Sequence, residues 1–299
     1  MEIKMIPLDK DLQLPKRTLA EFGEITKRVL YYLPNVLSGI EEKNNYKIYS
    51  SQIAGTTKFI RPINKNLFLQ NPEDFAQFFK SLSEVFRKVK AGSTILDEER
   101  DIVDRTIYTI QQSIGAGLDL VVNPNSARKH VGNRFEELIK VIFTEIGVAN
   151  KKLVLQIPYE TDEGLKTYKC ENDLILSPFQ KVRSTVDSLD EKEVVVSVKT
   201  TSKDRMGKMF IDKILLERFV QHPQKVIGIF LNDVQRKENN NISFTLVSGL
   251  FMVYTKFLTK LDGVYYLDPP PNASKQPYSG HMKKFSDLIS DDLKVLLTP

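Results

Sequence analysis

The segment at residues 194–205 constrains the fold of this chain more than any other, because an apolar run is followed there by charged residues. Its first five residues, Val-Val-Val-Ser-Val, form an apolar run that predicts a buried strand. Lys199 follows at the strand end, and the triplet Lys-Asp-Arg stands at residues 203–205. Side chains two residues apart on a strand share a face, so Val195, Ser197 and Lys199 point to the same side.

The elements around this strand predict an α/β fold for residues 126–299. Their order is helix, three strands, helix and strand, at residues 126–146, 152–159, 168–176, 193–200, 207–221 and 226–231. The last strand–helix–strand step needs a crossover, so strands 193–200 and 226–231 should be parallel neighbours. A short helix at 251–258 and a strand end at 265–267 complete this part.

Residues 1–125 are predicted to be mostly helical and to form a separate N-terminal region. Apolar residues recur at helical spacing over 19–33 and 75–89, and Asn71-Pro72 gives the second helix an N-cap and a proline at its first position. A third helix is expected over 97–114, with Gly115-Ala116-Gly117 as its end. This region would pack on the core and supply contacts for dimerisation or for a polyanionic partner such as DNA, which the charge of the chain permits.

Composition sets broad limits on the class of protein. The 299 residues are 41% hydrophobic and 27% charged, which is typical of a globular chain. The net charge of +5 and the pI of about 9.0 permit a polyanionic partner without requiring one. Cys170 is the single cysteine, and neither a membrane-span-length apolar run nor a signal-peptide core is present. We therefore expect a soluble, cytoplasmic protein without membrane partners.

Asp173 and Lys199 are the first candidates for a chemical site. Aspartate is depleted in strands, yet Asp173 stands directly before the apolar run at 174–176. Its carboxylate suits a divalent metal, which activates water and neutralises a phosphate, while Lys199 can stabilise the charge of the pentavalent phosphate. Together they indicate a metal-dependent nuclease site. His130, His222 and His281 are scattered, so we expect direct attack by metal-activated water.

A second carboxylate must come from another element, because Ser197 is a poor ligand where an acid would be convenient. Asp212 on the helix 207–221 shares its face with apolar side chains and so needs a partner. Glu217 on the same helix is the alternative, although its spacing from Lys213 suggests an exposed ion pair. Glu136 on the helix 126–146 is a candidate third ligand.

These residues resemble the PD-(D/E)XK nuclease superfamily. The pattern Ser197-x-Lys199, the triplet at 203–205 and an acid thirteen residues after the lysine resemble the branch of type II restriction endonucleases that read CCGG, CCNGG or CCWGG (EcoRII/SsoII/PspGI-like). In that branch the second acid has moved to the following helix. This chain departs from the family pattern at Asn172, where a proline is usual, and at Asp212, where glutamate is usual.

The resemblance implies a fold, a cofactor and partners. The fold would be an α-β-β-β-α-β core with a mixed central sheet flanked by helices, and the cofactor Mg²⁺, held by Asp173, Asp212 and Glu136. Lys203 and Arg205 would donate to guanine and Asp204 would accept from cytosine N4 in double-stranded DNA. A palindromic site implies a homodimer, and the family implies a cognate DNA methyltransferase.

Two other functions agree with the same residues. One is a nuclease of this superfamily that recognises DNA structure in repair or recombination. The other is a DNA-binding protein whose site is degenerate, a possibility raised by Ser197 and Asn172.

Overall fold

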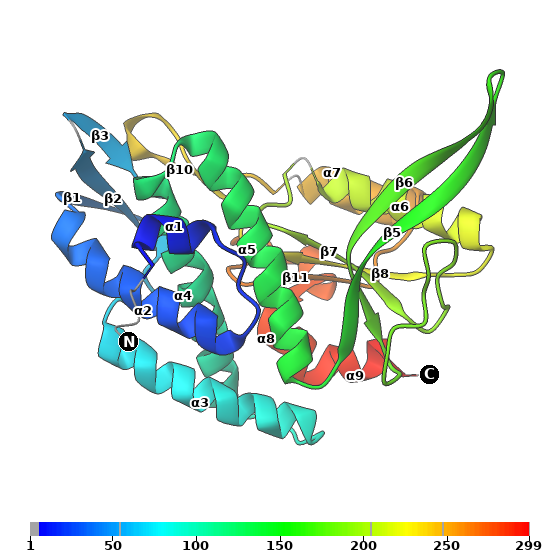
Figure 1. Ribbon diagram of the computed structural model, residues 1–299, viewed down its shortest axis with the longest axis horizontal. Coiled ribbons are helices and arrows are strands. Elements are labelled where there is room, and N and C mark those ends of the chain that lie inside the picture. Colours follow the sequence, from blue (N-terminus) through cyan, green and yellow to red (C-terminus); the bar gives the residue numbers. More distant parts are fainter. Residues whose placement is uncertain (1–5, 54, 204, 247, 299) are drawn as a thin grey trace. The chain divides into compact units, whose positions relative to one another are not determined.

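The computed structural model describes residues 6–53, 55–203, 205–246 and 248–298 (Figure 1). Two units form from discontinuous segments. Unit 1 comprises Met1–Ile142 and Asp233–Thr245, and unit 2 comprises Phe143–Asn232 and Leu246–Pro299. Helix α5 (Pro124–Glu145) crosses the boundary between them.

A six-stranded mixed sheet organises unit 2. Its spatial order is β12-β11-β8-β7-β6-β5. The pairs β5–β6 and β6–β7 are antiparallel, whereas β7–β8, β8–β11 and β11–β12 are parallel. The strands are β5 (Ala149–Thr161), β6 (Gly164–Ser177), β7 (Val194–Lys199), β8 (Lys225–Phe230), β11 (Gly263–Tyr266) and β12 (Met282–Lys284). The expected parallel pairing of residues 193–200 with 226–231 is confirmed.

Helices cover both faces of this sheet. Apolar side chains of α6 (Met206–Val220) and α7 (Ser248–Phe257) share one core with strands β5 to β8 and β11, and ring contacts join Phe210 to Phe251. On the opposite face, Tyr265 donates a hydrogen bond to Asp292, 2.9 Å away, in the segment that contains α8 (Phe285–Asp287) and α9 (Leu293–Leu296). Tyr266 belongs to the core shared with α6 and α7, whereas Tyr265 faces the other side of the sheet, as the two-residue period of a strand requires.

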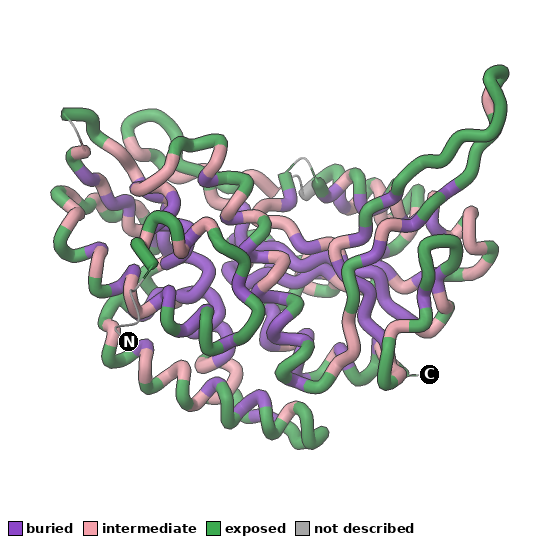
Figure 2. The backbone as a smooth tube through the Cα atoms, viewed as in Figure 1, coloured by how far each residue is buried: buried purple, intermediate pink, exposed green. Residues whose placement is uncertain are grey.

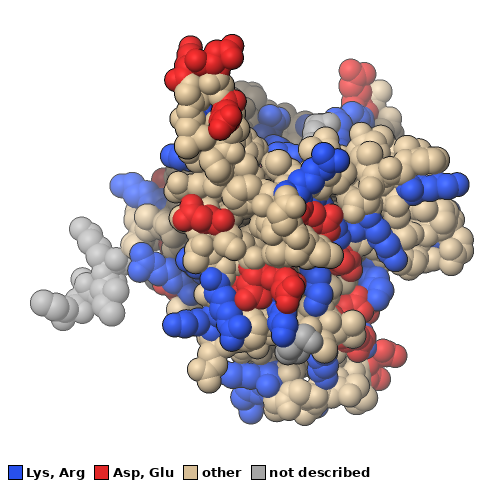
Figure 3. Space-filling view, turned by 90° about the vertical axis from the view of Figure 1, so that its right-hand side faces the viewer, with Lys and Arg blue, Asp and Glu red and all other residues tan. Residues whose placement is uncertain are grey.

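The hairpin of β5 and β6 extends beyond the sheet (Figure 1). Its outer half is exposed, whereas β7 and β8 are buried along most of their length (Figure 2). Acidic side chains gather at its free end, at the upper left of Figure 3, where Glu160, Asp162 and Glu163 lie. This end of the hairpin is therefore unsuited to contact phosphate.

Unit 1 combines helices with two small sheets. Its helices are α1 (Leu8–Gln13), α2 (Leu19–Val36), α3 (Pro72–Lys90), α4 (Asp97–Val121) and most of α5. The larger sheet has β2 (Tyr46–Ile53) paired with β1 (Gly39–Lys43), β3 (Thr56–Phe59) and β4 (Ile63–Asn64). The smaller one pairs β9 (Val234–Arg236) with β10 (Ile242–Phe244). The helical prediction for residues 1–125 did not include the sheet at 39–64.

Capping residues fix the ends of two helices, and the N-cap predicted at Asn71 is confirmed. The Asn71 side chain accepts hydrogen bonds from the backbone amides of Glu73 and Asp74 at 2.7 and 3.2 Å, and α3 begins at Pro72. Helix α5 ends before Gly147, whose φ of 84° lies in the left-handed region that glycine adopts readily.

The expected end of the third helix at residues 115–117 is wrong, because α4 continues to Val121. Its glycines allow close packing instead. A Cβ atom at Gly115 would lie 2.5 Å from the Arg61 guanidinium, which pairs with Asp119, and one at Gly117 would lie 2.8 Å from Leu12. A glycine inside a helix can thus mark a contact rather than a C-cap.

No helix among the described residues has both the length and the apolar character needed to span a bilayer.

Asp262 links α6 to the sheet, and its removal should destabilise unit 2. Its Oδ2 accepts hydrogen bonds from buried Lys213 at 2.6 Å and from the amide of Val226 at 2.8 Å. Asp262→Ala leaves a buried ammonium without its closest carboxylate, so we expect a loss of about 2 kcal/mol in the free energy of unfolding, measured by urea titration.

The matched control is Asp162→Ala, which removes the same charge from the exposed hairpin tip. It should change the unfolding free energy by less than about 0.5 kcal/mol. Equal effects of the two substitutions would contradict this role of Asp262.

Candidate active site

A fork between β6 and β7 positions the candidate site. The two strands pair only over residues 174–176 and 194–196, and Asp173, Ser197 and Lys199 lie beyond the last pair. A pocket of about 310 Å³ opens at this point. Its charged lining side chains come from β6, β7 and the start of α6: Lys169, Glu171, Asp173, Lys199, Arg205, Lys208 and Asp212.

An extra residue in β6 sets the direction of Asp173. Leu153 pairs with Asn172 and Lys151 pairs with Ile175, so three steps along β6 match two steps along β5. Such a bulge inserts a residue, shifts the alternation of side chains and is common beside active sites. It explains why Cys170 and Ile175, an odd number of residues apart, belong to the same core.

Asp173 is held by one backbone and one side-chain donor. Its Oδ2 accepts hydrogen bonds from the amide of Val198 at 2.8 Å and from Lys199 Nζ at 2.5 Å. The Asp173 side chain is 10% exposed and that of Lys199 is 30% exposed. The structure thus brings together the two residues that the sequence singled out, with their charged atoms in contact at the edge of the pocket.

Asp212 enters the same pocket from the first half of α6. Its Oδ2 accepts a hydrogen bond from Lys208 Nζ at 2.5 Å, and its side chain is 27% exposed. Burial lowers the pKa of Lys208, but the hydrogen bond to Asp212 and its charge more than offset this, and the pKa is raised overall. An acid on a largely apolar helix face thus has the partner that it needs.

Glu217 lies elsewhere on α6 and is absent from the pocket lining among the described residues. Its Oε1 accepts a hydrogen bond from the amide of Gln224 at 3.2 Å. The expected ion pair with Lys213 is present at 3.9 Å, but it is not exposed as predicted, because Lys213 is buried and lies closer to Asp262, at 2.6 Å. Glu217 is therefore bound to the turn after α6, and Lys213 is bound to Asp262 directly before β11.

The remaining candidates are Glu136 and the triplet at residues 203–205. Glu136 lies on the part of α5 that belongs to unit 1, so its role as a ligand stays a prediction. Lys203 is exposed in the loop between β7 and α6, and Arg205 is the N-cap residue of α6 and lines the pocket. Asp204 lies outside the described residues.

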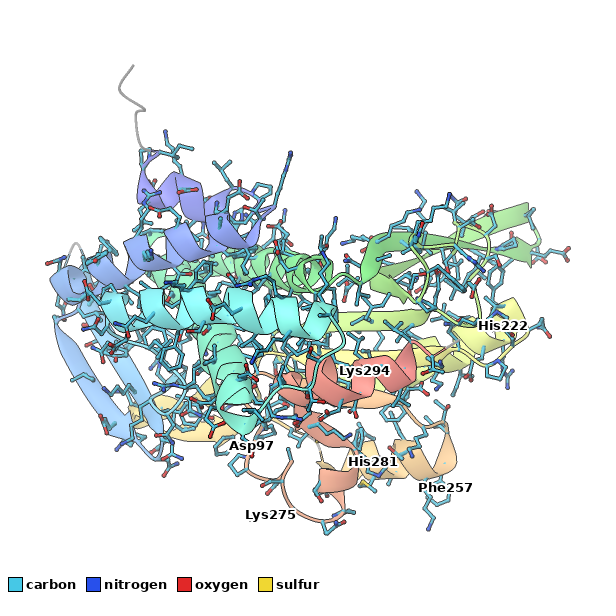
Figure 4. The ribbon with its side chains drawn as sticks, turned by 90° about the horizontal axis from the view of Figure 1, so that it is seen from below. Asp97, His222, Phe257, Lys275, His281 and Lys294 are labelled. Atoms are coloured by element: carbon cyan, nitrogen blue, oxygen red, sulfur yellow. The ribbon has the colours of Figure 1, made fainter. Side chains whose placement is uncertain are left out.

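Histidines form no group in unit 2. His222 lies at the end of α6 and His281 lies apart from it (Figure 4). The His222 ring nitrogens lie 2.9 and 3.0 Å from the carbonyl oxygens of Pro223 and Leu189, and the His281 ring packs on Phe251. These contacts give both rings a structural role.

The pocket suits a hard divalent cation in its donor chemistry. Asp173 and Asp212 contribute carboxylate oxygens, and Mg²⁺ commonly takes one or two carboxylates while it keeps water or phosphate ligands. Groups of three or more potential ligands are absent from the residues that the structure describes. Oδ2 of each carboxylate is engaged by a lysine, so a cation at that oxygen would compete with the ion pair.

Sequence reasoning missed Lys208, Lys169 and Glu171 as pocket residues. Lys208 could have been predicted as the partner of Asp212, because side chains four residues apart on a helix lie next to each other. Lys169 and Glu171 were harder to assign, since their direction depends on the bulge in β6.

Cys170 is a chemical probe for this region, because the charges of Asp212 and Lys208 act on its thiol. It is 2% exposed, and burial together with the charge of Asp212 raises the pKa of its thiol, while Lys208 opposes the shift. The thiolate is the reactive species, so the native protein should react slowly with a disulfide reagent at pH 8 and faster as the pH rises. Asp212→Asn should increase the native rate, because it removes a charge that raises the pKa.

The rate is measured by absorbance, with the protein in guanidinium as the unfolded reference and Asp162→Asn as the charge control. Equal rates for folded and unfolded wild type would contradict the burial of Cys170. An unchanged rate in Asp212→Asn would contradict the influence of Asp212.

Comparisons with known proteins address the fold. No protein-family model and no curated protein matches the sequence. The structure is similar to the crystal structure of the type IIP restriction endonuclease Kpn2I, with a TM-score of 0.71, 17% identity and coverage of 97% of each chain. It also matches a complex of the restriction endonuclease PspGI with substrate DNA, with a TM-score of 0.44, 15% identity and coverage of 75% of this chain and 92% of that chain. The likeness to Kpn2I shows that this chain has the fold of a type II restriction endonuclease.

Proposed function

We propose that the chain is a Mg²⁺-dependent type II restriction endonuclease that hydrolyses double-stranded DNA at a short palindrome containing CC…GG. The observation that carries this proposal is the pair of Asp173 and Lys199 at the fork of β6 and β7, with Asp212 in the same pocket. A fold shared with Kpn2I over 97% of the chain supports it.

Each side chain of the pocket has a distinct task in this proposal. Asp173 and Asp212 hold Mg²⁺ in this proposal. The bound ion lowers the pKa of its water and neutralises charge on the scissile phosphate. Lys199 donates hydrogen bonds to the phosphate as negative charge develops on its oxygens, and its contact with Asp173 fixes the direction of the ammonium.

Base recognition falls to the loop that follows β7. Lys203 and Arg205 donate to guanine O6 and N7, and Asp204 accepts from cytosine N4. Arg205 lines the same pocket as the two aspartates, which supports a base contact close to the cleaved phosphate. Each such contact contributes about 1–3 kcal/mol of discrimination.

A homodimer follows from the symmetry of the proposed DNA site. A palindrome has a two-fold axis, so two copies of one chain present the same residues to both strands. Each copy would cut one strand. A cognate methyltransferase would protect the host DNA, as in the family that the chain resembles.

Cleavage of plasmid DNA tests the proposal. Wild type with Mg²⁺ should give discrete fragments whose sequenced ends share a CC…GG palindrome, and EDTA should abolish them. Lys199→Ala should reduce the rate at least about 10²-fold, because one donor to the charged transition state is lost.

The matched control is Lys166→Ala, which removes an exposed lysine from an ion pair near the hairpin tip and should leave the rate unchanged. Random nicking that depends on Lys199 would favour a nuclease that recognises DNA structure. Binding without cleavage would contradict an enzymatic role and favour a degenerate site.

A pair of isosteric substitutions decides which acid of α6 serves the site. Asp212→Asn should reduce the cleavage rate at least about 10²-fold, because a ligand of the ion is lost. Glu217→Gln should retain most of the rate, since Glu217 is engaged at the end of α6. The opposite ranking in the same plasmid assay would assign the ligand to Glu217.

A further inference from the structure

We propose that Lys208 is a positioning residue that holds Asp212 in the metal-free pocket and competes with the cation for it. The proposal rests on the proposed function, because it assumes that Asp212 is a ligand of Mg²⁺. It adds a role for a lysine that the sequence pattern does not assign.

The geometry makes the competition direct. Lys208 Nζ lies 2.5 Å from Asp212 Oδ2, in a pocket that both side chains line. A cation that binds this oxygen meets the ammonium at close range, and the repulsion between the two positive charges makes them compete for Asp212. Lys199 holds Asp173 in the same way on the other side of the pocket.

The position of Lys208 on α6 is unfavourable for helix stability. It is the third residue of the helix, and the first turn of α6 has no acidic residue. The helix dipole favours negative charge at this end and opposes lysine there. A local rule that is broken at a pocket points to a functional use of the residue.

The exposure of Lys208 allows it to move. Its side chain is 53% exposed, compared with 27% for Asp212, so the lysine can leave the ion pair without repacking the core. Once displaced, the ammonium could meet a DNA phosphate at the pocket, whose lining also includes Arg205. Metal binding at Asp212 would thereby release the Lys208 ammonium for contact with the DNA backbone.

Calorimetric titration of Mn²⁺ into the protein without DNA tests this role and does not depend on cleavage. Lys208→Gln should bind Mn²⁺ about fivefold more tightly than wild type, which corresponds to an ion pair of about 1 kcal/mol. Lys208→Arg keeps the charge and should match wild type. Lys166→Gln, which removes a lysine from the exposed ion pair with Glu163, should also match wild type.

The outcomes separate this proposal from the proposed function. Equal or weaker Mn²⁺ binding in Lys208→Gln, with clear binding in wild type that Asp212→Asn abolishes, would overturn the role of Lys208 and leave the metal site intact. Absence of Mn²⁺ binding in wild type and in Lys208→Gln would overturn both the role of Lys208 and the proposed metal site. Tighter Mn²⁺ binding in both Lys208→Gln and Lys166→Gln would also overturn the role of Lys208, since the change in net charge alone would then explain the effect.

Discussion

The separation of β6 from β7 at Asp173 is the constraint on which the rest of the site depends. Where the ladder between these strands stops, the amide of Val198 would lack a strand partner, and the Asp173 carboxylate accepts its hydrogen bond instead. The same carboxylate binds Lys199. One side chain thus satisfies the backbone at the fork and orients the lysine. The bulge in β6 aims that side chain into the pocket.

Charge balance in the pocket follows from the same arrangement. Asp173 and Asp212 are each paired with a lysine, Lys199 and Lys208, so neither is left as an isolated charge in a partly buried site. The arrangement also sets the conditions for ligand binding. Under the proposed function, a divalent cation at these carboxylates would compete with the paired ammonium groups.

The strands that form the site were predictable because their patterns are strong. The apolar run at 194–198 and the charged residues after it predicted β7, and one crossover helix fixed its parallel pairing with β8. The Asp173–Lys199 pair followed, since Asp173 is an unusual acid within a strand and Lys199 stands at the end of the next strand. Asp212 was favoured over Glu217 because an acid on an apolar face needs a partner, and the structure provides Lys208.

Other features depend on tertiary contacts that a single sequence does not encode locally. Gly115 and Gly117 permit close packing inside α4 rather than ending the helix, and only the positions of Arg61 and Leu12 reveal this. The sheet at 39–64 consists of short strands whose pairing is set by their neighbours. The direction of Glu171 depends on one extra residue in β6.

The most direct test of the central claim is the single-turnover cleavage of a short CC…GG duplex by Asp173→Asn, with the protein in excess so that binding does not limit the rate. Asparagine keeps the size and an acceptor for Val198 but removes the charge that orients Lys199. A rate at least about 10²-fold below that of wild type, with DNA binding retained, is the predicted result. Cleavage by Asp173→Asn at the wild-type rate would contradict the placement of the site at this fork.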